Sequence, residues 1–399
     1  MGSLDGKRVL LCIGGGIAAY KCADLVRRLM GEGADVQVAM TRSAREFVSP
    51  LVLQTLSRHP VALELLDARE DAAIGHIRIA EEADVVLVAP ATANLIARMA
   101  AGMADDIVTA ALLVTRCPVV IAPSMNCNML DHPAVARNLA TLSSFGHRIA
   151  DSDNGELACG YEGAGRLPDA DALIAEVAAA LAPKDLAGRR VLISAGPTRE
   201  ALDPVRYLTN RSSGRMGYAV AAAAWRRGAD VTLVSGPTTL ATPRGVSRVD
   251  VTSAAEMHAA MLARASASDV VVMVAAVADY RAAEPAATKL KKKAGAPLTL
   301  ALAENEDILA ALGRLAGTRV LVGFAAETGD VVRHAREKLL RKGAHLIVGN
   351  DVTQPGAGFE IETNAAVLVD ADGECHTGVM SKDRLADLIL DRVVALSSR

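Results

Sequence analysis

Short runs of aliphatic residues occur in two matching sets along this chain. Residues 6–11 (GKRVLL) return as 188–193 (GRRVLI), and residues 83–88 (ADVVLV) return as 268–273 (SDVVVM). A strand exposed on one face alternates polar with apolar residues, whereas a strand covered on both faces is apolar throughout. The runs therefore predict an α/β protein with two doubly wound domains, each built on a buried parallel sheet.

The chain between these runs supports the same organisation. Helix-like stretches such as 18–31 separate the predicted strands. The segment Ala182–Gly188 is polar, contains proline and glycine, and follows an Ala-rich helical stretch at 171–181. It marks the predicted boundary between a domain at 1–187 and a domain at 188–399.

Charge and composition narrow the class of protein. The 399 residues carry 43 Lys and Arg against 46 Asp and Glu, with only 5 Tyr, 4 Phe and 1 Trp, which argues against nucleic-acid binding. The longest apolar stretch, Val270–Ala278, is far shorter than the ~18 residues of a membrane span, and no signal peptide is visible. Six cysteines without a Cys-x-x-Cys pair favour reduced thiols. We expect a cytoplasmic enzyme that binds neither nucleic acid nor membranes.

In open parallel sheets, ligands bind beyond the carboxyl ends of the strands. After the first predicted strand, Gly14–Ala19 (GGGIAA) offers small residues that let backbone N–H groups approach an anion. The run also fits a dinucleotide fingerprint, which expects an acidic residue after the second strand. That place is taken by Thr41, Arg42 and Ser43. A mononucleotide phosphate, NADP held by Arg42, and a plain tight turn are the three interpretations.

Further polar groups follow the other strands of the first half. Two Ala-Pro corners, at 89–94 and 122–126, look like two walls of one pocket. His76 precedes a helix-like stretch, although a lone histidine is more often packed or on the surface than catalytic. Cys159 lies among four glycines in the segment 154–167, a loop suited to a lid, where a thiol can donate a proton or be inert.

Taken in order, these motifs make the first half resemble the FMN-dependent cysteine decarboxylases, among them the phosphopantothenoylcysteine decarboxylases. The resemblance implies a flavodoxin-like, FMN-binding domain. The implied FMN contacts are Gly15, Gly16, Ile17, Ala18, Thr41, Ala91, Thr92 and Asn94. One departure is Leu130, which stands where the family's Pro-x-Met-Asn-x-x-Met motif usually continues with Trp.

The resemblance also implies a mechanism. A simple carboxylate leaves reluctantly because the resulting carbanion has no electron sink. FMN-mediated oxidation of the thiol to a thioaldehyde therefore precedes CO2 loss, and re-reduction completes the reaction. By resemblance, His76 assists oxidation and decarboxylation, and Asn126 holds the substrate or intermediate by its amide. Cys159 supplies the proton of the final reduction.

The second half carries features of a nucleotide site without a P-loop motif. Ser212, Ser213 and Gly214 precede an Ala-rich helix, which suits either phosphate binding or an ordinary helix cap. Asp279 follows the predicted strand at 270–274. The run Lys289–Lys293 is either a solvated loop or a cationic loop that could close over a triphosphate and neutralise developing charge.

Several segments of this half resemble the phosphopantothenoylcysteine synthetases, ligases that are fused to the decarboxylase in bacteria. They are 196–217, 275–292, 305–309, 323–328, 338–343 and 350–351. The resemblance implies a Rossmann-like nucleotide-binding domain. CTP, with Mg2+, would activate the carboxylate of 4′-phosphopantothenate as an acyl cytidylate, and the cysteine amine would then displace CMP.

The same resemblance assigns roles to single residues. Asn210 would hold the acyl cytidylate, Arg206 would assist the cysteine-dependent step, and Lys289 would stabilise charge in the first step. The implied nucleotide contacts are Ser212, Gly214, Ala275, Asp279, Lys289, Asp307, Ile308, Phe324, Lys338 and Lys342. One departure is the pair Glu304 and Glu306, where the family commonly shows Lys and Pro.

Together the two resemblances predict a bifunctional enzyme of coenzyme A biosynthesis. Its second half would make phosphopantothenoylcysteine, and its first half would decarboxylate that product to 4′-phosphopantetheine. They also imply decarboxylase trimers with FMN at the subunit interface and ligase dimers, which combine into a homo-oligomer, a dodecamer. The alternatives are a non-catalytic flavin-binding regulatory protein, disfavoured by His76, Asn126 and Cys159, and an NADP-dependent reductase.

Overall fold

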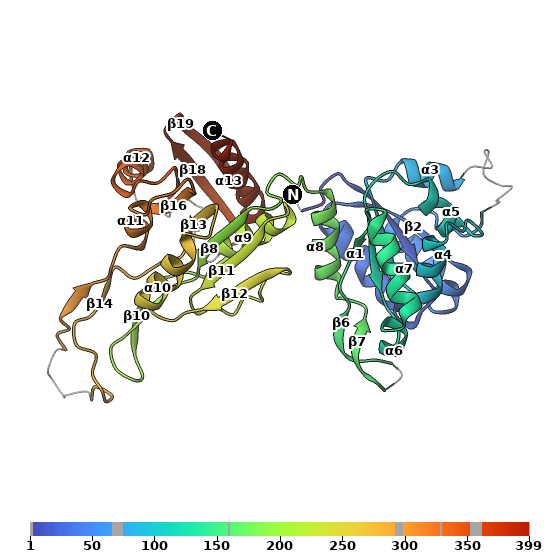
Figure 1. Ribbon diagram of the computed structural model, residues 1–399, viewed down its shortest axis with the longest axis horizontal. Helices are drawn as coiled ribbons and strands as arrows, with labels where there is room; N and C mark the ends of the chain where they lie inside the picture. The colour runs from blue at the N-terminus through green and yellow to red at the C-terminus, as the bar shows by residue number, and fades with distance from the viewer. Residues whose placement is uncertain are drawn as a thin grey trace. The chain divides into compact units, whose positions relative to one another are not determined.

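The computed structural model describes residues 3–65, 75–158, 160–291, 298–327, 329–351 and 361–398. The chain divides into two compact units, Met1–Ala182 and Pro183–Arg399, shown in Figure 1. The division precedes the predicted boundary at 187/188, because the connecting segment bonds to the second unit. Its residue Leu186 donates a backbone hydrogen bond to the carbonyl of Arg227 (3.2 Å).

The first unit is built on a parallel sheet with the strand order β2-β1-β3-β4-β5. Its strands are β1 (Arg8–Ile13), β2 (Asp35–Met40), β3 (Val85–Ala91), β4 (Val119–Pro123) and β5 (Arg148–Ile149). This is the flavodoxin-like strand order. The chain places β2 on one side of β1 and the later strands on the other side, so the switch point lies between β1 and β3. The predicted fold class of the first half is confirmed.

Helices cover both faces of this sheet. They are η1 (Ile17–Lys21), α1 (Cys22–Gly31), η2 (Arg42–Glu46), α2 (Pro50–Ser57), α3 (Gly75–Glu81), α4 (Ala93–Ala100), α5 (Ile107–Val114), α6 (Cys127–Leu130), α7 (Pro133–Ser144) and α8 (Ala170–Leu181). Leu11 of β1 shares a core cluster with Leu25 of α1, whereas Leu10 shares another with Ile96 of α4. Burial on both faces explains the uninterrupted apolar run of β1. A hairpin, β6 (Asp153–Glu156) and β7 (Glu162–Arg166), precedes α8.

The second unit has an eight-stranded sheet in the order β12-β11-β8-β13-β16-β17-β18-β19. Its strands are β8 (Arg190–Ala195), β11 (Asp230–Ser235), β12 (Val246–Asp250), β13 (Val270–Met273), β16 (Val320–Glu327), β17 (Leu346–Asp351), β18 (Thr363–Asp370) and β19 (Gly373–Ser381). The first six in spatial order are parallel and follow the Rossmann order 3-2-1-4-5-6, as expected. The strands β18 and β19 continue the sheet in antiparallel fashion, which the sequence analysis did not predict.

Among the residues described for this unit, five helices pack on the sheet, and two short ribbons follow its central strands β8 and β13. The helices are α9 (Arg215–Arg226), α10 (Ala254–Ala265), α11 (Ile308–Gly313), α12 (Val331–Lys342) and α13 (Lys382–Ser397). The ribbons pair β9 (Arg199–Ala201) with β10 (Tyr207–Thr209) and β14 (Tyr280–Ala282) with β15 (Leu302–Glu304). Within the described residues, no helix is long and apolar enough to cross a membrane.

The matching sequence sets make matching hydrogen bonds. The carboxylate of Asp84 accepts from the backbone N–H of Arg8 (2.8 Å), and that of Asp269 accepts from Arg190 (2.7 Å). In return, the backbone N–H of each aspartate donates to the carbonyl of the same arginine, at 2.9 Å in both domains. The repeated sequence pattern therefore corresponds to one hydrogen-bonding arrangement that joins the starts of two adjacent parallel strands.

Candidate functional site

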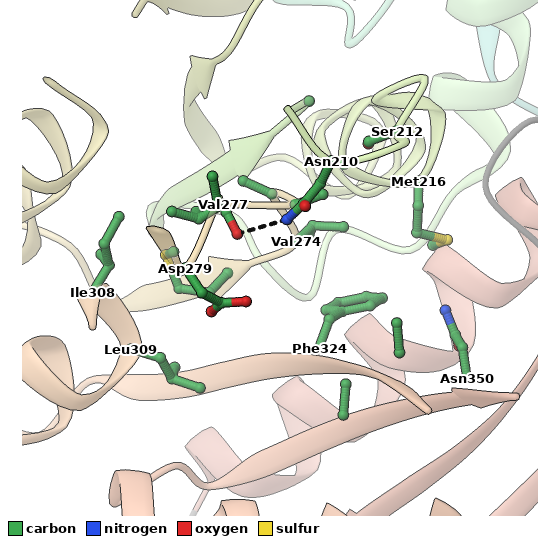
Figure 2. Close-up of a pocket in the computed structure, with 18 of the residues that line it drawn as sticks. Asn210, Ser212, Met216, Val274, Val277, Asp279, Ile308, Leu309, Phe324 and Asn350 are labelled. Carbon is green, nitrogen blue, oxygen red and sulfur yellow. Dashed lines mark hydrogen bonds between the residues drawn. The ribbon is translucent and has the colours of Figure 1, made fainter. Parts of the chain in front are cut away.

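A cavity of about 870 Å³ opens beyond the ends of β8 and β13 in the second domain (Figure 2). Its lining brings together residues from distant parts of the chain, including most of those expected to contact the nucleotide. They are Asn210, Ser212, Gly214, Ala275, Asp279, Asp307, Ile308, Phe324, Lys338 and Lys342. Two predicted residues, Arg206 and Lys289, are not part of this lining.

The backbone after β13 forms one wall of the cavity, and buried hydroxyl groups hold it. Ser194 Oγ accepts hydrogen bonds from the backbone N–H groups of Val274 and Ala275 (3.1 Å each). Thr198 Oγ1 accepts from the N–H of Ala278 (3.0 Å). Ser194 and Thr198 are fully buried. Ser194 lies near the end of β8 and Thr198 follows that strand, and neither role was predicted from the sequence.

Two amide side chains hold the same wall. Asn210 donates from Nδ2 to the carbonyl of Val277 (2.9 Å), and Asn305 donates from Nδ2 to the carbonyl of Ala278 (2.8 Å). Because Nδ2 of Asn210 is engaged, the side chain offers its Oδ1 as an acceptor to a ligand. Figure 2 shows the carboxylate of Asp279 directed into the same cavity.

The amino terminus of α9 lies directly against the end of β8. Gly214 caps this helix with a φ of +80°, and an ideal Cβ at that residue would lie 3.4 Å from Cα of Gly196. An ideal Cβ at Gly217 would lie only 2.5 Å from Cβ of Ala195. Glycines at these places let the helix amino terminus, with its backbone N–H groups, approach the ligand site.

Cationic side chains of α12 also line the cavity. Lys338 donates from Nζ to the carbonyl of Phe324 (2.7 Å), and burial lowers the pKa of this lysine. Lys342 is bonded to the carboxylate of Asp307. Burial alone would raise the pKa of Asp307, but the hydrogen bond from Lys342 holds it below its usual range. This carboxylate also caps α11 by accepting from the N–H of Ala310 (2.8 Å).

Arg206 and Lys289 lie together, away from the cavity lining. The guanidinium of Arg206 donates from Nη2 to Asp203 Oδ2 (2.6 Å) and to the carbonyl of Leu290 (2.6 Å). Lys289 precedes Leu290 and is exposed. The remainder of the predicted lysine run, at 292 and 293, lies outside the described residues.

In the first domain, the segments that follow β1, β2 and β3 lie close together. An ideal Cβ at Gly15 would lie 2.1 Å from Ser43 Oγ, and one at Gly14 would lie 2.4 Å from the carbonyl oxygen of Pro90. Thr92 caps α4 by accepting at Oγ1 from the N–H of Leu95 (3.3 Å). Gly14 and Gly15, which we call the floor of this site, can approach their neighbours this closely only because they have no side chains.

The two Ala-Pro corners and the hairpin also adjoin. The backbone N–H of Ser124 donates to the carbonyl of Ala91 (3.0 Å), which links the two corners. Met125 donates to the carbonyl of Gly165 in β7 (3.0 Å), and Asn126 begins α6 beside it. Cys159 lies outside the described residues.

His76 lies elsewhere in the domain. It belongs to the first turn of α3, which packs against α5. Figure 1 shows α3 and α6 at opposite ends of the domain, so one copy of the chain does not bring His76 to Asn126. The Nδ1 atom of His76 is buried and has no hydrogen-bond partner among the described residues.

Two protein families match the sequence in the same order as the two domains. Residues 2–182 match the family described as Flavoprotein, and residues 186–396 match the DNA/pantothenate metabolism flavoprotein C-terminal domain. Similar proteins from several bacteria carry the name Coenzyme A biosynthesis bifunctional protein CoaBC. The one from Vibrio cholerae is 50% identical over 98% of both chains, and that from Escherichia coli K12 is 49% identical over 98% of both. The one from Bacillus subtilis is 45% identical over 99% of this chain and 98% of the relative.

The chain belongs to the family of bifunctional coenzyme A biosynthesis proteins. The predicted family and both predicted fold classes are therefore confirmed. Membership covers both domains, because each of the two family models matches one of them. The roles of single residues stay predictions.

Proposed function

We propose that the chain joins 4′-phosphopantothenate to cysteine with CTP and then decarboxylates the product to 4′-phosphopantetheine. Its membership in the bifunctional family supports the pairing of a ligase with a flavoprotein decarboxylase. The observation that carries the proposal furthest is the cavity of the second domain, where most of the expected nucleotide contacts share one lining.

The cavity offers positive potential for a nucleoside triphosphate. The amino terminus of α9 presents backbone N–H groups behind Ser212, and Lys338 and Lys342 of α12 add two cationic side chains. A carboxylate oxygen of 4′-phosphopantothenate would attack the α-phosphorus of CTP, and pyrophosphate would leave. The amine of cysteine would then attack the acyl carbon of the cytidylate, lose a proton and release CMP.

Asn210 suits the task of holding the acyl cytidylate. Its hydrogen bond to Val277 fixes the amide, so that Oδ1 can accept a hydrogen bond from the bound intermediate or from the incoming amine. Pre-fixed orientation lowers the entropic cost of reaching the reactive geometry. The hydroxyl groups of Ser194 and Thr198 fix the backbone to which Asn210 is tied.

Magnesium would enter with the nucleotide. Within the described part of the chain, no group of three or more His, Cys, Asp or Glu side chains could hold a metal ion. Mg2+ commonly keeps several waters and binds through one or two carboxylates together with substrate phosphates. Asp279, which faces the cavity, is the carboxylate we assign to this contact.

The first domain fits FMN. Gly14 and Gly15 let the chain segments at the ends of β1, β2 and β3 approach closely at the switch point of a flavodoxin-like sheet, and Thr41 and Thr92 lie at the same edge. FMN bound there would supply the oxidation and the re-reduction that surround CO2 loss. The chain's own residues would position the substrate through Asn126 and move protons through His76 and Cys159.

Oligomers would complete both sites. Because His76 and Asn126 lie at opposite ends of one domain, we assign His76 to the site of a neighbouring copy, as in the decarboxylase trimers that the resemblance implies. Likewise, Arg206 and Lys289 would reach a cavity in the ligase dimer. Trimers and dimers combined would give the dodecamer.

A single incubation tests both activities. The purified full-length chain is supplied with 4′-phosphopantothenate, cysteine and Mg2+, with either CTP or ATP, and product masses, pyrophosphate and CO2 are measured. We expect CTP-dependent pyrophosphate, then CO2 and 4′-phosphopantetheine, and pyrophosphate without CO2 when cysteine is left out. Absence of a CTP-dependent amide product would overturn the ligase assignment, and absence of bound flavin would overturn the decarboxylase assignment.

A further inference from the structure

The turn that carries Arg206 contains a buried carboxylate with many donors. Asp203 is 4% exposed, although it lies in the connection between two short ribbon strands. Its Oδ1 accepts from the backbone N–H groups of Val205 and Arg206 (2.8 Å each). These two bonds close the turn locally, as aspartate commonly does.

The other oxygen of Asp203 binds a segment far away in the sequence. Its Oδ2 accepts from the backbone N–H of Leu290 (3.1 Å) and from Nη2 (2.6 Å) and Nε (3.0 Å) of Arg206. Arg206 in turn donates from Nη2 to the carbonyl of Leu290 (2.6 Å). A turn that served only its own geometry would not need these bonds to residue 290.

A second contact fastens the same segment at its other end. The backbone N–H of Ala286 donates to the carbonyl of Leu202, beside Asp203 (2.9 Å). Lys289 lies between these two attachment points. Its backbone is therefore held against the turn that carries Arg206, while its side chain is exposed.

Charge favours the same arrangement. Burial alone would raise the pKa of Asp203, but the hydrogen bonds from Arg206 hold it well below its usual range, so the carboxylate is ionised near neutral pH. This negative charge lies beside Arg206 and next to the stretch that contains Lys289 and Lys291. Without it, the cationic groups would face one another without compensation.

We propose that Asp203 is a positioning residue of the ligase reaction, which places Arg206 and Lys289 in a fixed relation to each other. The inference rests on the proposed function of those two residues. Arg206 is held through Nε and Nη2, and its Nη1 makes no hydrogen bond within the described part of the chain, so Nη1 faces no competition for a ligand oxygen. Asp203 itself does not line the cavity and acts through the two cations.

Limited proteolysis tests the anchor without depending on activity. Trypsin cleaves after lysine, and the bond Lys289–Leu290 contains the N–H that Asp203 binds, so cleavage there requires local opening. In the full-length chain, we expect Asp203→Asn to raise this cleavage about tenfold. Glu284→Gln, an exposed residue of the same extension, should leave it unchanged. Equal cleavage in wild type and Asp203→Asn would overturn the anchor.

Half-reaction kinetics test the positioning role. We expect Asp203→Asn to lower the kcat of CTP-dependent pyrophosphate release about 10- to 100-fold, as misplaced catalytic groups do, with KM for CTP within about twofold. Decarboxylation of supplied phosphopantothenoylcysteine should be unchanged, and the nearly normal KM for CTP excludes misfolding of the second domain. The double variant Asp203→Asn with Lys289→Gln should be no slower than Lys289→Gln alone, because Asp203 acts through Lys289.

The outcomes separate this inference from the function on which it rests. Additive losses in the double variant, or an Asp203→Asn enzyme as fast as wild type, would overturn the positioning role while leaving the ligase assignment intact. A wild-type chain that releases no pyrophosphate from CTP would overturn the ligase assignment and the positioning role together. The proteolysis result would still decide whether the anchor exists.

Discussion

The two domains begin their sheets alike and end them differently. Asp84 and Asp269 tie the first strands with the same pair of hydrogen bonds. At the opposite edge, the second domain gathers its predicted nucleotide contacts around one cavity of about 870 Å³. In the first domain, by contrast, α3, which contains His76, and α6, which Asn126 caps, lie at opposite ends (Figure 1). The same architecture thus brings the predicted residues of one site together around a cavity and separates two predicted residues of the other.

The largest expected effect concerns this division of the first site. We expect His76→Ala and Asn126→Ala each to lose decarboxylation by about 10³-fold, the scale of a lost general acid–base or positioning group. If neighbouring copies share each site, co-expression of the two variants should restore a substantial fraction of activity, because some sites then contain both intact residues. CO2 release from supplied phosphopantothenoylcysteine measures it.

The matched control for this mixture is the double variant His76→Ala/Asn126→Ala co-expressed with either single variant, which cannot form an intact site. Ligation should be unchanged in every mixture. A mixture of the two single variants that stays as inactive as this control would show that each site forms within one copy.

The next largest effect concerns Asn210, whose partner in the cavity wall belongs to the same copy of the chain, so co-expression of variants is not needed to test it. In Asn210→Asp, the hydrogen bond to the carbonyl of Val277 is replaced by repulsion between a carboxylate and a carbonyl oxygen. We expect amide formation to fall about 100-fold, since both the wall and the intermediate lose a partner. Decarboxylation of supplied phosphopantothenoylcysteine should stay at the wild-type rate. Asn210→Ala should disturb the cavity wall less than Asn210→Asp does, and its affinity for CTP should therefore fall less. Wild-type ligation by Asn210→Asp would contradict the role.

Sequence patterns predicted much of the fold that the two domains share. Uninterrupted apolar runs predicted buried parallel strands, and the residues after β1, β8 and β13 predicted where ligand sites would form. The patterns could not show that Ser194 and Thr198 hold the wall after β13, because a buried serine and a surface serine look alike in sequence. Nor could they reveal β18 and β19, whose pairing depends on contacts with β17 rather than on local preference.

Glycine substitutions compare the floors of the two sites. A methyl group at Gly15 would overlap Ser43, and one at Gly217 would overlap Ala195. We expect Gly15→Ala and Gly217→Ala each to cost about 1–3 kcal/mol of stability in their own domains, as overpacking does. Gly15→Ala should also lose bound flavin, whereas Gly217→Ala should keep it and raise KM for CTP. Visible absorbance of the purified variants measures flavin content, and full flavin in Gly15→Ala would contradict the assigned floor.

The smallest expected effect tests the similarity itself. In Asp84→Ala and Asp269→Ala, the backbone N–H of Arg8 or Arg190 loses its carboxylate acceptor at the start of the sheet. Because both groups are partly exposed and water can replace the acceptor, we expect each variant to lose only about 1 kcal/mol, measured by urea unfolding of the full-length chain with domain-specific probes. Asp84→Asn and Asp269→Asn keep an acceptor oxygen and should lose less. A large loss in one domain and none in the other would show that the shared sequence pattern hides different structural roles.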